Sequence, residues 1–318
     1  MIHVPARDIP APTSLSPEAR AIVGMGAFAG VPYPPLDDIE DWRSMIAQSD
    51  ATMVELIDDS ASQQPAQVKE IDVDGVRVYV LTPDDLPDDE GRVILEIHGG
   101  GFITGAGECC RKMGLRAAAR SRASTWAVDY RMPPDHPYPA PVDDCLTVYR
   151  ELLREHSPGQ VVVSGASAGG NLAAALILRA RDEGLPLPAA AVLMTPEADL
   201  TESGDSFETN LGLDNLLTQR LMPANLLYAN GHDLSNPYLS PLFADFTRGF
   251  PPTILTTGTR DLFLSNTVRL HRALRAADVP AELHVMEGAG HGGFLGQAPE
   301  DAELEREISS FIDAHWAA

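Results

Sequence analysis

The stretch that most constrains this chain is a short strand, a tight turn and a helix around Ser167. Residues 161–163 are three valines without polar alternation, a pattern typical of a strand covered on both faces in a parallel sheet. Apolar, helix-forming residues run from Asn171 to Leu178, and Gly184 is placed to end that helix. The turn between them reads Gly165-Ala-Ser167-Ala-Gly169, in which glycines let strand and helix approach closely. This pattern makes Ser167 a candidate nucleophile, although an ordinary Gly- and Ser-rich turn accounts for the same residues.

Strand patterns and helix patterns alternate along the rest of the chain. The pair Asp74-Gly75 between two alternating strands predicts a tight hairpin. Strands that alternate with helices predict a mostly parallel central sheet flanked by helices, which is the α/β class. The predicted strands lie at 68–81 (a hairpin), 93–97, 124–128, 161–163, 189–194, 253–256 and 282–286, and the predicted helices lie at 108–120, 142–155, 171–178, 265–277 and the C-terminus.

Two segments do not fit this alternation. Residues 1–65 predict two helices, one that starts at Ser16-Pro17 and one over roughly 37–60, so we expect a separate N-terminal unit before a main domain at 66–318. Residues 199–238 delay the next strand and are too apolar for a disordered loop. We expect an inserted helical element near the strand ends that serves as a substrate cap, whereas the N-terminal pair of helices could be a small domain, a linker-like arm or a lid over a pocket.

The composition excludes several kinds of partner. A net charge of −23 over 318 residues argues against binding to nucleic acids or anionic membrane surfaces. No run approaches ~18 apolar residues, and the N-terminus lacks the basic and apolar regions of a secretory signal, so neither a membrane span nor secretion is expected. The three cysteines include an adjacent pair, which indicates a reduced set that packs in helices and a cytoplasmic protein. They are Cys109, Cys110 and Cys145.

A nucleophilic serine needs a general base and a carboxylate that orients this base. Of the four histidines from residue 271 to the C-terminus, only His291 follows a strand in a loop, and the glycines around it leave room for an imidazole. The other three lie in predicted helices or a strand: His271, His284 and His315. Asp261 comes one short turn after the strand at 253–256, at the carboxyl edge of the predicted sheet. Two alternatives stay open, namely that Asp261 only caps the next helix and that Glu287 is the acid.

The developing oxyanion needs hydrogen-bond donors, and two stretches can supply them. His98-Gly99-Gly100-Gly101 follows the buried strand at 93–97, and its glycines expose N–H groups with no Cβ to block a substrate carbonyl. A further donor is expected from Ala168, the residue after the serine. This chemistry needs no cofactor, and Cys109-Cys110 has no further ligands at metal-binding spacing, so no metal site is expected.

Together these motifs resemble the hormone-sensitive-lipase-like family of α/β-hydrolases, the bacterial family IV esterases. The matching stretches are His98-Gly-Gly-Gly-Phe102, Tyr130-Arg-Met-Pro-Pro-Asp-His-Pro-Tyr-Pro139, Gly165-Ala-Ser-Ala-Gly-Gly170 and Asn236-Pro-Tyr-Leu-Ser-Pro241. The resemblance runs from about residue 68 to the end and implies the α/β-hydrolase fold, with a helical cap from the N-terminus and an insertion. It differs at Ala166, where family members often have Asp or Thr.

By this resemblance each predicted site residue has a role. Ser167 is implied as the nucleophile, His291 as the base and Asp261 as the orienting acid. The implied oxyanion donors are Gly100, Gly101 and Ala168, with Gly99 shaping the loop.

The resemblance implies a cofactor-free carboxylesterase that acts on short- to medium-chain acyl esters. A weaker likeness to monoterpene ε-lactone hydrolases, in residues 199–209 and 258–265, makes lactone hydrolysis the alternative. A non-catalytic receptor for a small ligand is the alternative outside this class, and it is disfavoured because such receptors lose the histidine that this chain keeps as His291. Family members often dimerise, so a homodimer is expected.

Overall fold

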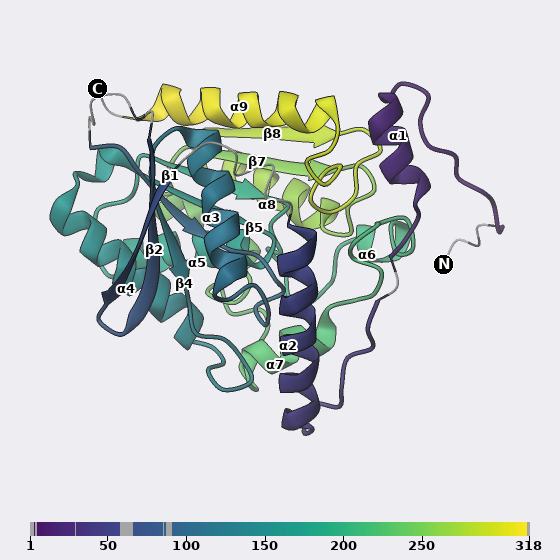
Figure 1. Cartoon of the computed structure of the whole chain (residues 1–318), viewed down its shortest axis with the longest axis horizontal. Coiled ribbons are helices and arrows are strands. Elements are labelled where there is room, and N and C mark those ends of the chain that lie inside the picture. Colours follow the sequence, from purple (N-terminus) through teal and green to yellow (C-terminus); the bar gives the residue numbers. More distant parts are fainter. Residues whose placement is uncertain are drawn as a thin grey trace.

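A sheet of eight strands organises the fold (Figure 1). The computed structural model describes residues 3, 5–28, 30–57, 66–84, 86 and 91–316. The strands lie in the spatial order β1-β2-β4-β3-β5-β6-β7-β8, and all neighbours from β4 to β8 pair in parallel. They are β1 (Ala66–Val73), β2 (Val76–Pro83), β3 (Val93–Ile97), β4 (Ser124–Asp129), β5 (Val161–Ala166), β6 (Ala190–Met194), β7 (Thr253–Gly258) and β8 (Ala281–Met286). The predicted, mostly parallel α/β sheet is thereby confirmed.

Strand pairing brings distant segments together at the carboxyl edge of the sheet. The predicted hairpin forms between β1 and β2, with Val73 opposite Val76 and the two turn residues at positive φ.

In the parallel pair β3–β5, Ile97 lies opposite Gly165. The segments that follow β3 and β5 therefore start side by side, and these segments contain the glycine loop and Ser167.

Helices cover both faces of the sheet. On one face, Val161 and Val163 belong to a core with α4 and α5, while on the other face Val162 packs with residues of α9. This alternation follows from the two-residue period of a strand. The helices are α1 (Pro17–Gly24), α2 (Ile39–Leu56), α3 (Glu108–Ser121), α4 (Ala140–Glu155), α5 (Ala168–Asp182), α6 (Ser206–Thr209), α7 (Met222–Ala229), α8 (Leu264–Ala276) and α9 (Pro299–His315). Within the described ranges, none of them is long and apolar enough to cross a membrane.

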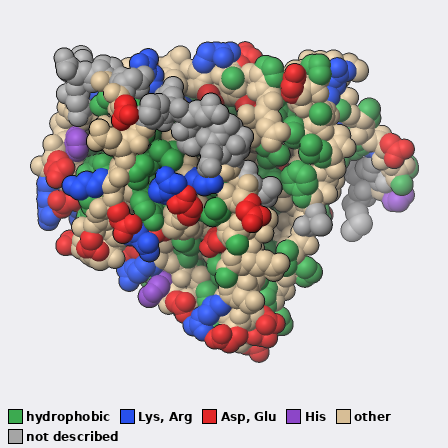
Figure 2. Space-filling view, in the orientation of Figure 1, with side chains coloured by type: hydrophobic (Ala, Val, Ile, Leu, Met, Phe, Trp, Pro, Cys, Tyr) green, Lys and Arg blue, Asp and Glu red, His purple; other side chains and the backbone are tan. Residues whose placement is uncertain are grey.

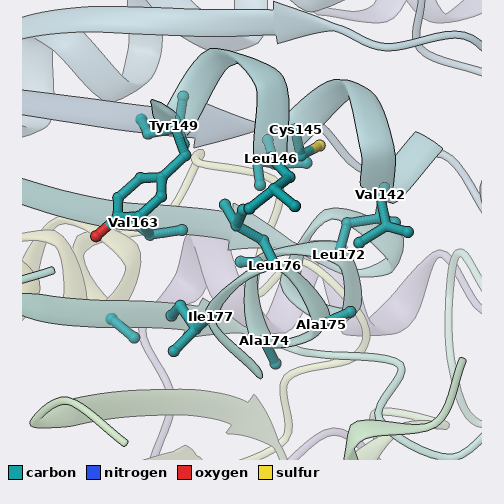
Figure 3. Packing of buried hydrophobic residues seen from close by; sticks show 14 of the residues in the cluster. Val142, Cys145, Leu146, Tyr149, Val163, Leu172, Ala174, Ala175, Leu176 and Ile177 are labelled. Atoms are coloured by element: carbon teal, nitrogen blue, oxygen red, sulfur yellow. The ribbon is translucent and has the colours of Figure 1, made fainter. Parts of the chain in front are cut away.

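The largest core lies between α4, α5 and the sheet. Figure 3 shows Val142, Leu146 and Tyr149 of α4 facing Leu172 and Leu176 of α5. Twelve residues of α5 are buried, so this helix is enclosed by the fold and holds its own N-terminus firmly against the sheet. The three cysteines lie in α3 and α4, where they are buried and form no disulfide: Cys109, Cys110 and Cys145.

The two N-terminal helices pack against loops at the carboxyl edge of the sheet. Helix α1 starts as predicted, with the hydroxyl of Ser16 accepting a hydrogen bond from the N–H of Ala19 at 3.1 Å. Its buried face joins a cluster that includes Ala289 and Phe294, on either side of His291. Helix α2 buries Trp42 against Ile103 and Ala224, so it covers the glycine loop and α7. The predicted continuation of this helix to residue 60 lies partly outside the described residues.

Acidic side chains dominate the surface charge. The chain has 46 Asp and Glu residues against 23 Lys and Arg residues. Figure 2 shows a group of carboxylates at the lower end of this face, where Figure 1 places the start of α2. Asp38 caps this helix, and Glu40 and Asp41 occupy its first turn. Negative charge at a helix N-terminus interacts favourably with the helix dipole, which explains this local concentration.

Candidate active site

Ser167 lies on a strained turn between β5 and α5. Its backbone has φ 58° and ψ −123°, a conformation that residues other than glycine rarely adopt. The turn is tight because a methyl group on Gly165 would lie 2.3 Å from the Gly169 carbonyl oxygen, and one on Gly169 would lie 2.0 Å from the Ile97 carbonyl oxygen. Glycines at both positions therefore allow strand and helix to approach closely and leave the side chain of Ser167 half-buried at the edge of the sheet.

The glycine loop after β3 comprises residues 98–101. Two of its N–H groups, those of Gly100 and Gly101, form no hydrogen bond within the loop. The Gly99 carbonyl accepts from His98 Nδ1 at 2.8 Å, and the Gly100 carbonyl accepts from the N–H groups of Ile103 and Thr104 at 3.1 and 3.0 Å. In a trans peptide the N–H points opposite to the C=O. The N–H groups of Gly100 and Gly101 are thus turned outward, and no described residue accepts a hydrogen bond from them.

The N–H group of Ala168, the residue after the serine, is also turned outward. The Ser167 carbonyl accepts hydrogen bonds from the N–H groups of Asn171 and Glu197, both at 3.2 Å, so the Ala168 N–H points the other way. Among the described residues it has no acceptor, as expected for the first residue of a helix. Gly99 packs against this turn, because a methyl group on it would lie 2.9 Å from the Ala166 carbonyl oxygen. Glycine loop and serine turn are therefore in direct contact.

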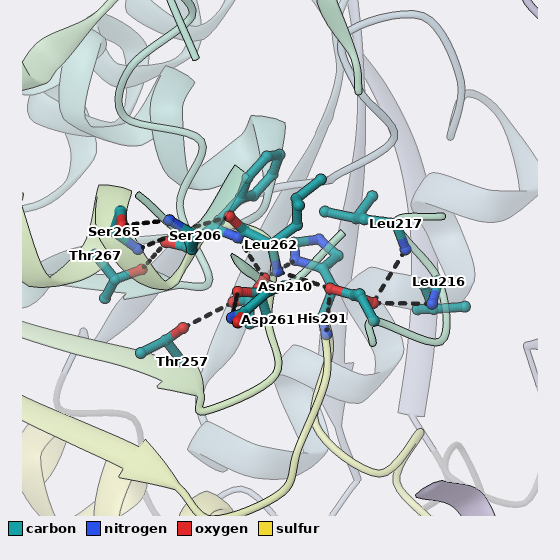
Figure 4. Close-up of polar contacts among 12 residues, drawn as sticks. Ser206, Asn210, Leu216, Leu217, Thr257, Asp261, Leu262, Ser265, Thr267 and His291 are labelled. Carbon is teal, nitrogen blue, oxygen red and sulfur yellow. Dashed lines mark hydrogen bonds and ion pairs between the residues drawn. The ribbon is translucent and has the colours of Figure 1, made fainter. Parts of the chain in front are cut away.

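His291 and Asp261 form a buried pair (Figure 4). His291 Nδ1 lies 3.1 Å from Asp261 Oδ1. Asp261 is fully buried, and its carboxylate also accepts from the Thr257 hydroxyl and the Phe263 N–H, both at 2.8 Å. A carboxylate only accepts, so Nδ1 carries the proton and Nε2 is left as the basic nitrogen. The hydroxyl of Ser167 bonds to no described residue, His291 included, and such contacts often tighten only when substrate is bound.

Three acidic side chains influence the basicity of the imidazole. Burial disfavours the charged form of His291, but Asp261, Asp214 and Glu197 together outweigh burial and raise its pKa above the ordinary value. Asp261 follows β7, Glu197 follows β6, and Asp214 comes from the insertion at 199–238. Of the three, only Asp261 was predicted from its place in the sequence.

Glu197 is an unusual buried carboxyl group beside the serine. It is fully buried, and no described side chain gives its carboxyl oxygens a hydrogen bond of good geometry. Burial raises its pKa to about 8, and the neighbouring carboxylate of Glu202 adds to this effect, while Asn225 and His291 oppose it. Its position directly after a buried strand is the signal that sequence reasoning could have used.

We expect Glu197→Gln to stabilise the protein at alkaline pH. The pKa of Glu197 rises from 4.5 to about 8 on folding, so between these values the folded state keeps a proton that the unfolded state has lost. Stability therefore decreases as pH rises through this window, by on the order of a few kcal/mol, and glutamine mimics the protonated form. Urea unfolding at pH 5 and pH 9 checks this: the free energy of unfolding should fall less in the variant. An equal fall in both proteins would contradict it.

Of the two candidate acids, Asp261 contacts the imidazole of His291, whereas the Glu287 side chain is exposed. Asp261 also accepts from the Phe263 N–H at the start of α8, so it fulfils part of the capping role as well. The three other histidines considered as the base contact other groups: His271 and His315 bond to the carbonyls of Ala281 and Phe311, and His284 Nε2 lies 3.7 Å from Glu282 Oε2.

One group of side chains behind the glycine loop is of metal-binding type. His98, Cys110 and Asp129 bring potential ligand atoms within 4.8 Å of one another. The Asp129 oxygens are already engaged, by the Gly107 N–H at 2.9 Å and by Arg77 Nε at 3.0 Å. Burial raises the pKa of the Cys110 thiol well above its ordinary value, whereas metals bind the thiolate. The group therefore fits a role in anchoring α3 better than a metal site, and the predicted absence of a metal stays a prediction.

Comparisons with known proteins agree with this geometry. The sequence profile of a family with the alpha/beta hydrolase fold matches residues 94–295. An esterase of Acinetobacter venetianus is 32% identical over 225 residues, which cover 69% of this chain and 74% of the relative. The crystal structure of the esterase E25 superposes with a TM-score of 0.91 at 35% identity, covering 100% of this chain and 99% of that one. A hormone-sensitive lipase from a metagenome library gives a TM-score of 0.81 at 30% identity, over 95% of this chain and 99% of that one.

The match to the family profile covers more than half of the 318 residues, and the structural similarity extends over the whole chain. The resemblance suggested by the sequence motifs is thereby confirmed. This chain belongs to the α/β-hydrolase family, in its hormone-sensitive-lipase-like branch of bacterial esterases.

Proposed function

We propose that this carboxylic ester hydrolase acts through an acyl-enzyme formed on Ser167. The observation that carries the proposal is the buried His291–Asp261 pair at the same sheet edge as a strained serine turn with free N–H groups. A base, an acid that orients it and preorganised oxyanion donors are the parts that acyl transfer requires. Relatives named as esterases support an enzyme over a receptor.

The proposed reaction has two halves. Ser167 Oγ bonds to the ester carbon while His291 Nε2 takes its proton, and the carbonyl oxygen becomes an oxyanion held by the N–H groups of Gly100, Gly101 and Ala168. Collapse of this intermediate breaks the ester C–O bond, and His291 gives the proton to the departing alcohol. Water then attacks the acyl-enzyme with His291 as base again, which releases the carboxylic acid and restores Ser167.

We propose that residues 1–65 and about 199–238 form a cap over this site, on a catalytic domain at 66–318. Helix α2 packs on the glycine loop through Trp42 and Ile103. From the insertion, Leu221 Cδ2 lies 3.6 Å from where a methyl group on Gly101 would be, and Leu216 Cδ1 lies equally close to the corresponding position on Gly292. These two leucines therefore limit the room above the oxyanion donors and beside the base, which favours small acyl groups.

We expect Leu221→Ala to shift the preference towards longer acyl chains. The leucine is buried over Gly101, so its removal opens space next to the oxyanion donors. The ratio of kcat/KM for p-nitrophenyl octanoate to that for the acetate should rise about tenfold, the order expected for a few methylene contacts. Leu226 is exposed in α7 and offers a matched control whose replacement by alanine should leave the ratio unchanged. An unchanged ratio in Leu221→Ala would contradict the proposed cap contact.

Two measurements test the proposed function directly. The chain should hydrolyse p-nitrophenyl esters of two to eight acyl carbons, and a fluorophosphonate should block this activity by forming one covalent adduct. Mass spectrometry of the digested protein should locate the adduct on the peptide that contains Ser167. Absence of nitrophenol release at every chain length, or a blocking adduct on another residue, would overturn the proposal.

Three further predictions concern lactone hydrolysis, the oligomeric state and the location in the cell. Lactone hydrolysis would follow the same steps, so kcat/KM on matched open and cyclic esters compares the two activities. The expected homodimer can be checked by light scattering coupled to size-exclusion chromatography. The predicted cytoplasmic location stays a prediction from the sequence.

A further inference from the structure

Asp214 is a buried carboxylate of the insertion whose two oxygens each accept two hydrogen bonds. The N–H groups of Leu216 and Leu217 donate to Oδ1 at 2.9 and 3.0 Å. The N–H groups of Leu262 and His291 donate to Oδ2 at 2.8 and 3.1 Å. Figure 4 shows that the four donor residues, Leu216, Leu217, Leu262 and His291, lie together although they come from separate segments. Asp214 is fully buried, so the group is a fixed part of the interior.

Two of these four donors belong to the loops that contain the proposed acid and base. Leu262 directly follows Asp261, and the other donor is the backbone of His291 itself. One carboxylate oxygen thus links the loop after β7 to the loop after β8. Asn210, four residues before Asp214, also ties the insertion to the loop after β7 by donating from Nδ2 to the Asp261 carbonyl at 2.8 Å.

The surroundings of Asp214 are shaped for this contact. A methyl group on Gly290 would lie 3.2 Å from Asp214 Oδ1, so glycine there lets the base loop approach the carboxylate. In the described part of the chain no Arg or Lys forms an ion pair with Asp214. Its negative charge therefore acts on His291, where it adds to the effect of Asp261 and raises the pKa of the imidazole.

We propose that Asp214 is a positioning residue of the active site. It holds the loop after β7 (the acid loop, with Asp261) and the loop after β8 (the base loop, with His291) so that Asp261 Oδ1 lies within hydrogen-bond distance of His291 Nδ1. This inference rests on the proposed roles of Asp261 and His291. Asp214 does not touch the reacting atoms in this proposal. It acts through the backbone on either side of the pair, and its two further bonds to Leu216 and Leu217 fix the insertion to the same point.

The first test is Asp214→Asn. An asparagine has one acceptor oxygen and turns an NH₂ group towards one of the two pairs of N–H donors, so one pair loses its acceptor. We expect kcat to fall about 10- to 100-fold with KM nearly unchanged, because the proposed catalytic pair is displaced while the substrate pocket stays. Loss of the negative charge should also lower the His291 pKa. The acid limb of the pH profile, where kcat/KM falls with decreasing pH, should then move to lower pH.

Two further variants separate positioning from general stability. Asp199 is equally buried in the same insertion, accepts hydrogen bonds from Thr201 and Ser203 and pairs with Arg269 of α8, but no bond of this carboxylate reaches either loop. Asp199→Asn should therefore lower stability and keep kcat and the acid limb. In Gly290→Ala the new methyl group crowds the carboxylate of Asp214 without removing it, so kcat should fall several-fold. This variant keeps the proposal testable if Asp214→Asn does not fold.

The outcomes distinguish this inference from the proposed function. An Asp214→Asn enzyme with wild-type kcat and acid limb would overturn it, as would equal losses of kcat in Asp214→Asn and Asp199→Asn. If the wild type hydrolyses no ester, the proposed function fails instead. In that case an NMR titration that follows the chemical shift of His291 Hε1 still measures how Asp214 affects the pKa of the imidazole. An unchanged His291 pKa in Asp214→Asn would by itself refute the electrostatic effect of Asp214 on His291.

Discussion

Replacing Ser167 by alanine is expected to lower kcat for ester hydrolysis by about 10⁴- to 10⁶-fold and to leave the fold intact. The variant lacks the proposed nucleophile but keeps the oxyanion donors and the His291–Asp261 pair, so the remaining rate comes from those groups alone. The backbone strain at this position is the same for serine and alanine, because both carry a single Cβ. Hydrolysis of p-nitrophenyl acetate and thermal unfolding, measured on the same preparations, check both parts.

Ser164 provides a matched control within the same strand. It is fully buried three residues earlier in β5, and its hydroxyl accepts a hydrogen bond from Arg120 at 3.2 Å. Ser164→Ala should reduce stability, because Arg120 loses an acceptor, and should keep kcat near the wild-type value. A Ser167→Ala protein that retains most of the wild-type kcat would show that another group is the nucleophile.

Asp261→Ala is expected to lower kcat by about 10⁴-fold. Without the carboxylate the Nδ1–H of His291 has lost its acceptor, so neither the tautomer nor the orientation of the ring is maintained. Asp261→Asn should lose less, because the Thr257 hydroxyl can turn to accept from the new NH₂ group. The amide oxygen can then still face His291 and Phe263. Both variants remove a negative charge that raises the His291 pKa, so the acid limb should move to lower pH.

The alternative acid supplies the control for this experiment. Glu287 is exposed, so Glu287→Gln should leave kcat and its pH dependence unchanged. The prediction is wrong if Glu287→Gln costs more activity than Asp261→Ala, or if Asp261→Asn is no more active than Asp261→Ala. Full pH profiles of kcat/KM for the three variants decide both points.

Much of the fold could be predicted because its signals are local. The valines of β5, the Asp74-Gly75 turn and the Ser16-Pro17 helix start each depend on residues close in sequence. The proposed triad was accessible for a related reason. Parallel strands end at one edge of a sheet, so a residue that directly follows a predicted strand is already placed roughly in space.

The start of α5 shows where local propensity fails. The sequence favoured a helix from Asn171, because two glycines precede it and glycine disfavours helix. The structure starts the helix at Ala168. A methyl group on Gly169 would lie 2.0 Å from the Ile97 carbonyl oxygen, so the close contact with β3 requires glycine there. Tertiary contact therefore outweighs the unfavourable propensity.

The insertion could be predicted only in outline. Its apolar residues indicated helices, and α6 and α7 are present, but much of the segment is irregular and is held by buried polar side chains. Asp199, Glu202, Asn210 and Asp214 each bond to a backbone or side-chain group that is distant in sequence and close in space through the fold. Partners of this kind leave no periodic pattern in the sequence, so the role of Asp214 needed the structure.

The carboxylates around His291 also affect how a turnover ends. The ester that enters the site is neutral, whereas the acid that forms ionises at neutral pH and leaves as an anion. It is produced near the buried carboxylates of Asp214 and Asp261, in a protein with a net charge of −23. Like charges repel, so the electrostatic field acts on the product but not on the substrate and drives the acid outward. The negative charge of this chain thus favours product departure and disfavours esters that already carry a negative charge.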